Sequence, residues 1–190
     1  MGLNTLRVYG MNITKEILWL AEKRIEDIPI LKNSIRGKEA NLIGSIGEVL
    51  FEKFIQEQGL SLEKEEGEQE KYNHDYVIEG KFTVDVKTKE RSVKPKSYYD
   101  CTVAQESLDH QKPDFFYFIS LLKKGGIFTE GFMLGGIDLE TLFEKGEHWG
   151  AGEIDARNGK RIRVDCVSIE IKDLIGNDDF INILVCSNRI

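Results

Sequence analysis

Cysteine, histidine and long apolar runs are all scarce in this sequence of 190 residues. The 3 cysteines, at 101, 166 and 186, are far apart and show no C-x-x-C spacing, so neither a disulfide framework nor a zinc site is indicated. The 3 histidines form no metal-ligand spacing either. No apolar run approaches the roughly 18 residues of a membrane span, and residues 1–10 lack the layout of a secretion signal. We therefore expect a soluble, cytoplasmic protein without membrane contact.

An excess of positive charge is also missing, because the formal net charge is −7. This argues against a protein coated in basic residues for general nucleic-acid binding, although it is compatible with a local basic surface. One acidic run has no apolar face, and we expect it to form a solvated loop without a catalytic role. The run comprises Glu63, Glu65, Glu66, Glu68 and Glu70.

Apolar residues, in contrast, are plentiful at 41% of the chain. In a chain of this length they are sufficient for one substantial core, which predicts a single domain over residues 1–190. Helical spacing of apolar residues predicts two long helices, over residues 13–25 and 38–58. Shorter helices are expected over residues 103–110 and 139–145.

Strand signals alternate with these helices along the chain. Residues 76–78 and 82–87 predict a hairpin whose turn is Glu79-Gly80. Residues 115–122 are nearly all apolar or aromatic, which predicts a strand buried on both faces. Further strands are expected over residues 127–135, 164–171 and 181–186, and a polar segment over residues 88–96. Together these elements predict an α/β fold with a mixed central β-sheet flanked by α-helices.

Three acidic-x-Lys triplets occur, namely Glu79-Gly80-Lys81, Asp85-Val86-Lys87 and Glu170-Ile171-Lys172. The first contains a turn glycine, where side chains are poorly held for a metal site. In the third, Glu170 follows Asp165 by an odd number of residues, which would place the two carboxylates on opposite faces of a strand. Only the middle triplet has a suitable partner.

That partner is Asp75, which a two- or three-residue turn would bring almost opposite Asp85. Directly opposed residues have Cβ atoms about 5 Å apart, and two such carboxylates repel each other unless a cation lies between them. Oxygen ligands suit Mg²⁺ or Mn²⁺, and the carbonyl of Val86 would add a third oxygen. Lys87, on the face of Asp85, would then offset negative charge on a phosphate or an attacking water, as phosphodiester hydrolysis requires. The alternative interpretation is an exposed hairpin with a salt bridge of about 1 kcal/mol or less.

This arrangement resembles the PD-(D/E)XK nuclease superfamily. His74-Asp75 resembles its first motif, with His in place of the named Pro, and Asp85-Val86-Lys87 resembles its second. Gly44-Ser45-Ile46-Gly47-Glu48 resembles its Gly-containing helix with a catalytic Glu, and residues 114–122 resemble the buried strand that follows. The resemblance covers roughly residues 44–122 and implies a restriction endonuclease-like fold.

The resemblance also implies roles. Glu48 would help to bind a metal or orient water, and Gly44 and Gly47 would let its helix approach the sheet closely. The alternative is that Glu48 is an exposed helix residue, and Glu52, one turn later, is the substitute. The implied activity is a metal-dependent deoxyribonuclease, more specifically an endonuclease, that uses Mg²⁺ or, in its place, Mn²⁺.

The implied substrate is DNA, with a homodimer as one way to build specificity. Two other functions stay open. One is an RNA-directed nuclease on the same fold, and the other is a catalytically silent nucleic-acid-binding module.

A basic segment directly after Lys87 is the first candidate for nucleic-acid binding, and its alternative is a solvated loop. The segment contains Lys89, Arg91, Lys94 and Lys96, followed by Tyr98 and Tyr99. A second basic cluster, which ranks below it, surrounds the predicted turn Asn158-Gly159 and contains Arg157, Lys160, Arg161 and Arg163. Gln105 and Gln111 are candidate polar neighbours of the site, with ordinary helix surface as the alternative.

Overall fold

The computed structural model describes residues 8–26, 38–64 and 74–186. Within these residues the main sheet has the strand order β1-β7-β6-β4-β3-β2. β4 (Phe82–Arg91) and β6 (Phe115–Lys124) pair in parallel, and every other neighbouring pair is antiparallel. The remaining strands are β1 (Tyr9–Asn12), β2 (Leu62–Lys64), β3 (Tyr76–Ile78) and β7 (Ile127–Asp138). The expected α/β class with a mixed sheet is therefore confirmed.

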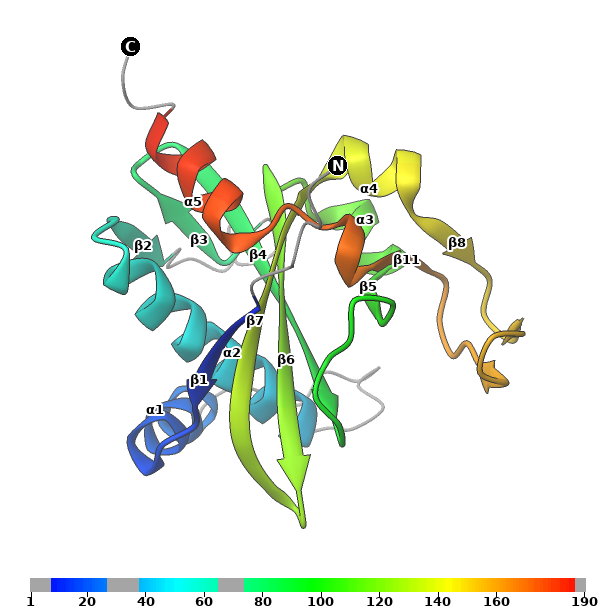
Figure 1. Ribbon diagram of the computed structural model, residues 1–190, viewed down its shortest axis with the longest axis horizontal. Coiled ribbons are helices and arrows are strands. Elements are labelled where there is room, and N and C mark those ends of the chain that lie inside the picture. The colour runs from blue at the N-terminus through cyan, green and yellow to red at the C-terminus, as the bar shows by residue number, and fades with distance from the viewer. Residues whose placement is uncertain (1–7, 27–37, 65–73, 187–190) are drawn as a thin grey trace.

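Three helices cover one face of this sheet, on the left in Figure 1: α1 (Lys15–Ile25), α2 (Lys38–Glu57) and α5 (Asn177–Cys186). Their apolar stripes share one core with the sheet, in which Leu50 and Phe180 lie with Val84 and Tyr117. The helical spacing of apolar residues explains α1 and α2, whose predicted bounds agree with the structure to within about two residues.

A second layer covers the other face of the main sheet, on the right in Figure 1. It is a three-stranded antiparallel sheet of β5 (Asp100–Ala104), β11 (Cys166–Glu170) and β8 (Glu147–Trp149), with helices α3 (Gln105–His110) and α4 (Leu139–Lys145). A 3-10 turn (Ile171–Asp173) follows β11, and a short hairpin of β9 (Ile154–Asp155) and β10 (Lys160–Arg161) extends from this layer.

β6 separates the two cores and is buried from Phe115 to Leu122, as its apolar sequence predicts. Phe115 and Tyr117 face the helices, whereas Phe116 and Phe118 face the second layer. The same alternation governs β4. Val84 and Val86 belong to the helix-side core, and the side chains of Asp85, Lys87, Lys89 and Arg91 are directed by the two-residue period to the face of the second layer.

Three sequence predictions differ from the structure. Residues 181–186 belong to helix α5 instead of a strand, because a short apolar run carries too little periodicity to separate the two. Residues 103–104 end strand β5, and only Gln105–His110 are helical. The polar segment predicted over residues 88–96 is a strand as far as Arg91, since pairing with β6 continues to that residue.

Two further predictions concern the acidic run and membrane-spanning segments. Of the acidic run, Glu63 lies in β2, and the residues from Glu65 to Glu70 fall outside the described part of the chain. No helix in the described ranges is long and apolar enough to span a membrane.

Candidate active site

The hairpin of β3 and β4 creates the candidate site. Its turn consists of Glu79 and Gly80, which have φ angles of 53° and 61°, and Lys81 N donates to Ile78 O at 3.1 Å. Two consecutive residues with positive φ are the mark of the tight turn that matches strand twist. The register pairs Tyr76 with Val84 at the end of the ladder, and Asp75, one residue further out, lies close enough to Asp85 for the two charges to interact.

Asp75 is fixed by the backbone of the facing strand. Its N–H donates to Val84 O at 3.0 Å, and its Oδ2 accepts from Val86 N at 2.7 Å. Burial and the charges of Asp85 and Glu48 raise the pKa of Asp75 to about 8. Asp85 and Glu48 thus lie within electrostatic reach of Asp75, and a cation bound beside these carboxyl groups would relieve the repulsion.

Asp85 and Lys87 form the inner part of the site. Asp85 is 1% exposed, and Lys87 Nζ lies 2.7 Å from its Oδ1. This contact is a close ion pair, and within the described residues Asp85 Oδ1 is buried without a hydrogen bond. Lys87 Nζ donates instead to Gln111 Oε1 at 2.9 Å and lies 5.6 Å from the ring centre of Phe116. A buried carboxylate oxygen with spare acceptor capacity is suited to a cation.

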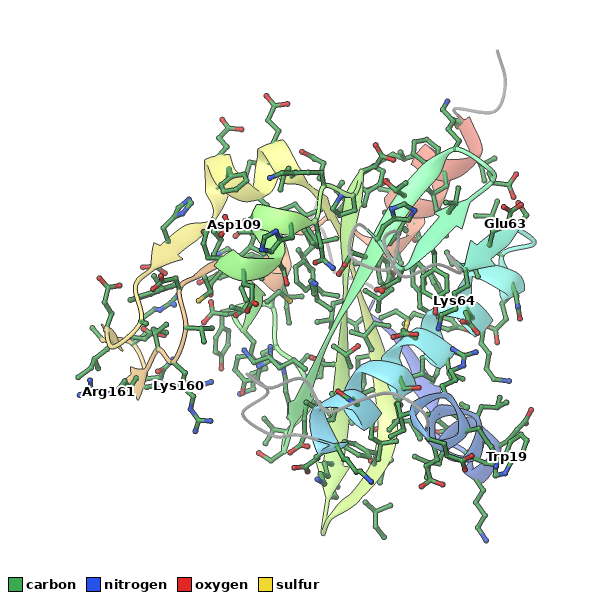
Figure 2. All side chains as sticks on the ribbon, turned by 180° about the vertical axis from the view of Figure 1, so that it is seen from behind. Trp19, Glu63, Lys64, Asp109, Lys160 and Arg161 are labelled. Carbon is green, nitrogen blue, oxygen red and sulfur yellow. The ribbon has the colours of Figure 1, made fainter. Side chains whose placement is uncertain are left out.

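Glu48 approaches the site from α2, and its partner is Lys64, whose Nζ lies 2.7 Å from Glu48 Oε2. Figure 2 shows Lys64 on the side of the molecule where α2 runs past β2. Glu52, the alternative candidate, has other partners. It pairs with Arg24 at 2.6 Å and accepts a hydrogen bond from the hydroxyl of Tyr76 at 2.8 Å. Of the two glutamates, Glu48 is therefore the one whose charge acts on Asp75.

Gly47 lets α2 pack closely on β4, as expected, because a Cβ at this position would lie 1.9 Å from Thr88 Oγ1. The same expectation is wrong for Gly44, where a Cβ would meet no atom within 4 Å. The face of β4 that α2 contacts carries Thr88, whereas Asp85 and Lys87 belong to the opposite face. Glu48 thus reaches Asp75 from a different layer than the one that contacts Lys87.

The donor set fits a hard divalent cation. In the described ranges no three His, Cys, Asp or Glu side chains gather closely enough to hold a metal ion on their own. Mg²⁺, however, is usually bound through one or two carboxylates, with water and substrate phosphates completing its shell. Asp75 and Asp85 supply such a pair of carboxylates, and the specific observation in favour of the fit is the buried Asp85, whose Oδ1 has Lys87 Nζ at 2.7 Å but makes no hydrogen bond.

The four predicted phosphate-binding residues do not stay together. Lys89 and Arg91 are half-buried on β4 and donate to the carbonyl of Asp100, at 3.4 and 2.6 Å. Lys94 is exposed and pairs with Glu130 at 3.0 Å, and Lys96 lies beside the ring of Tyr98. The segment therefore divides into two groups. Lys89 and Arg91 lie on the same strand face as Lys87, whereas Lys94 and Lys96 lie beyond the strand.

Gln111 contacts Lys87, whereas Gln105 bonds Asp109 along its own helix. Sequence analysis missed Ser107, which accepts from Lys87 Nζ at 3.4 Å, because no motif distinguishes a serine on a short helix. It also missed Asp100 as a partner of the β4 cations, since a backbone carbonyl leaves no signal in the sequence. No family model matches the sequence, and no curated protein matches it significantly.

Proposed function

We propose that this chain is a metal-dependent nuclease of the PD-(D/E)XK kind, with a restriction endonuclease-like fold, that hydrolyses DNA phosphodiester bonds as an endonuclease. The observation that carries the proposal is the proximity of Asp75 and Asp85 in a tight hairpin, where Asp75 accepts from Val86 N and Lys87 Nζ lies 2.7 Å from Asp85. An exposed hairpin with an ordinary salt bridge is a poorer explanation, because Asp85 is only 1% exposed and its charge acts on the neighbouring carboxyl group of Asp75.

Asp75 and Asp85 would hold Mg²⁺, or Mn²⁺ in its place, together with the carbonyl oxygen of Val86. Such an ion, when bound, lowers the pKa of a bound water and stabilises negative charge on the phosphate. Glu48 would orient water or support the cation from α2. The ammonium of Lys87 would offset the charge that develops on the phosphoryl oxygens, and Gln111 Oε1 holds that ammonium in position by accepting a hydrogen bond from it.

DNA is proposed as the substrate, in the cytoplasm, and a homodimer is proposed as one way to gain specificity. Two alternatives predict different outcomes. An RNA-directed nuclease on the same fold would cleave RNA in preference to DNA. A catalytically silent module would bind nucleic acid without cutting it.

A cleavage assay separates these possibilities. Circular, linear, nicked and branched DNA, and RNA, are incubated with the purified chain in Mg²⁺, Mn²⁺ or EDTA. We expect nicking or cutting of DNA with either metal and none with EDTA. Asp85→Asn, a substitution of nearly equal size at a buried site, should keep the fold and lose the activity.

The matched control is Glu170→Gln, because Glu170 begins another acidic-x-Lys triplet of the same chain. It should cleave like the natural sequence. Cleavage in EDTA, or full activity of a folded Asp85→Asn variant, would contradict the proposal. Faster cleavage of RNA than of every DNA form would favour the RNA-directed alternative.

A further inference from the structure

The cations of β4 continue beyond Lys87 toward the β9–β10 hairpin. Lys89 and Arg91 follow Lys87 at two-residue steps, about 6.6 Å each along a strand, on the same face. Both donate to the carbonyl of Asp100, and Arg91 also donates to Ser120 Oγ at 2.9 Å. Neither has a carboxylate within ion-pair distance among the described residues. Two positive charges thus converge on one neutral acceptor.

The hairpin is anchored at the same residue. Arg157 pairs with the carboxylate of Asp100 at 3.3 Å and with buried Asp155 at 2.9 Å. It also lies 3.2 Å from Glu147 and 3.8 Å from Glu170. Arg157 is therefore a structural tether whose charge is neutralised. It docks the hairpin on β5, next to the cations of β4.

Docking by Arg157 leaves the other cations of the hairpin facing solvent. Lys160, Arg161 and Arg163 are exposed, and no carboxylate of the described residues pairs with them. Figure 2 shows Lys160 and Arg161 at this outlying hairpin, on the opposite side of the view from Trp19. Burial, followed by the charges of Arg91 and Lys160, lowers the pKa of Lys89 to about 8. The cations of both elements thus lie within electrostatic reach of one another, and an anion would stabilise them.

We propose that Lys89 and Arg91 of β4 and Lys160 and Arg161 of the hairpin form one surface, which binds the phosphate backbone of duplex DNA beyond the cleavage site. The choice of DNA as the ligand of this surface rests on the proposed function. The surface begins next to Lys87, on the same face of β4. The hairpin, and not the linear segment that ends at Lys96, is the second element of this surface. Lys94 forms an ion pair with Glu130 on β7 instead.

Duplex DNA suits this surface better than a single strand. Single strands are bound largely by bases stacking on bare aromatic rings. Two rings beside the cluster already carry guanidinium groups: Arg91 lies 5.0 Å from the ring centre of Tyr99, and Arg157 lies 5.8 Å from that of Trp149. Cations on two separate elements are instead suited to phosphates along a duplex.

Binding is tested with a fluorescent duplex of DNA and the full chain in EDTA, where cleavage cannot interfere, by anisotropy over a series of salt concentrations. Lys160→Ala/Arg161→Ala should bind more weakly and lower the magnitude of the salt slope of log affinity by roughly 1.8, which is two phosphate contacts at about 0.9 each. The exchanged pair Lys160→Arg/Arg161→Lys should keep the natural slope. Lys160→Gln alone should lower it by roughly 0.9.

The control is Lys15→Ala/Lys23→Ala on α1, which removes the same number of charges at the far side of the molecule (Figure 1) and should leave the slope unchanged. An unchanged salt slope in both the double alanine variant and Lys160→Gln would contradict the proposed surface. So does a larger effect on single-stranded DNA or duplex RNA than on duplex DNA. Hairpin-dependent binding without cleavage would contradict the proposed activity alone, and cleavage with an unchanged slope would contradict the surface alone.

Discussion

At the residue scale, the site brings buried carboxyl groups close together. Asp85 is buried, with Lys87 Nζ 2.7 Å from an oxygen that makes no hydrogen bond, and Asp75 accepts from Val86 N beside it. Such groups lower the stability of a protein and are concentrated at functional sites. Elsewhere in the described chain, buried carboxylates are satisfied. Asp155, at 3% exposure, accepts hydrogen bonds from Arg157 and Asn158.

Lys89 gives a prediction about stability and pH. Its pKa falls from 10.5 to about 8 in the folded chain, through burial and the charges of Arg91 and Lys160. The unfolded chain therefore binds more protons between these values, and the free energy of unfolding rises with pH in that window. Lys89→Met should be more stable than the natural sequence at pH 7, and this advantage should shrink toward pH 10. Urea unfolding at both pH values measures it.

Lys15→Met, at an exposed residue of α1, controls for the loss of a lysine and should show no comparable gain. Equal stability of Lys89→Met and the natural sequence at pH 7 would show that burial of this ammonium carries no cost.

The paired aspartates could be predicted from the sequence because they depend on local geometry alone. The turn residues Glu79-Gly80 fix the register, and the register fixes which side chains oppose each other. The environment of Lys87 could not be predicted in the same way. Ser107 of α3 and Gln111, the residue after its end, contact Lys87, and these contacts depend on how the second layer packs on the main sheet.

At the scale of the element, α2 carries Glu48 and depends on one glycine for its position. Gly47→Ala would place a Cβ against Thr88, and we expect a loss of stability of about 1 to 3 kcal/mol, with displacement of the neighbouring Glu48. Gly44→Ala is the matched control on the same helix. It meets no atom within 4 Å and should raise stability by roughly 0.5 to 1 kcal/mol, because alanine favours a helix interior. Thermal or urea unfolding of both variants measures this difference.

Thr88→Ala tests the cause of that loss. Thr88 Oγ1 is buried without a hydrogen-bond partner among the described residues, so removing it costs little by itself. In the Gly47→Ala background, Thr88→Ala should restore part of the lost stability, because it removes the hydroxyl that the new Cβ meets. The restoration should be incomplete, because the Cβ of residue 88 remains 2.9 Å from the new atom. Equal effects of Gly44→Ala and Gly47→Ala would refute this account of helix packing.

Elements with strong periodicity were predicted, and those defined by tertiary pairing were not. α2 and β6 carry long, consistent patterns. β1, by contrast, is the short segment Tyr9–Asn12, which is a strand only because it pairs with β7. The end of α5 was mistaken for a strand because its apolar residues cluster there. The signal for a helix lies earlier, in Asp178 and Asp179, because acidic residues are favoured in the first turn of a helix.

At the scale of the whole molecule, two layers meet on β4, and each contributes a different part of the site. The helix layer supplies Glu48, and the second layer supplies Gln111 and the β9–β10 hairpin. The strand itself supplies Asp85 and Lys87. This division explains why the motif residues are local in sequence, whereas the residues that support them come from distant segments.

The measurement that tests the central claim most directly compares the Mg²⁺-dependent cleavage rates of Lys87→Ala and Lys172→Ala on the same DNA. Both variants remove the lysine of an acidic-x-Lys triplet, but Lys172 is exposed and pairs only locally with Glu170. The account predicts that Lys87→Ala loses on the order of 100-fold or more in rate, with the fold and the affinity for DNA in EDTA retained, while Lys172→Ala cleaves like the natural sequence. A folded Lys87→Ala variant that cleaves at the natural rate would contradict it.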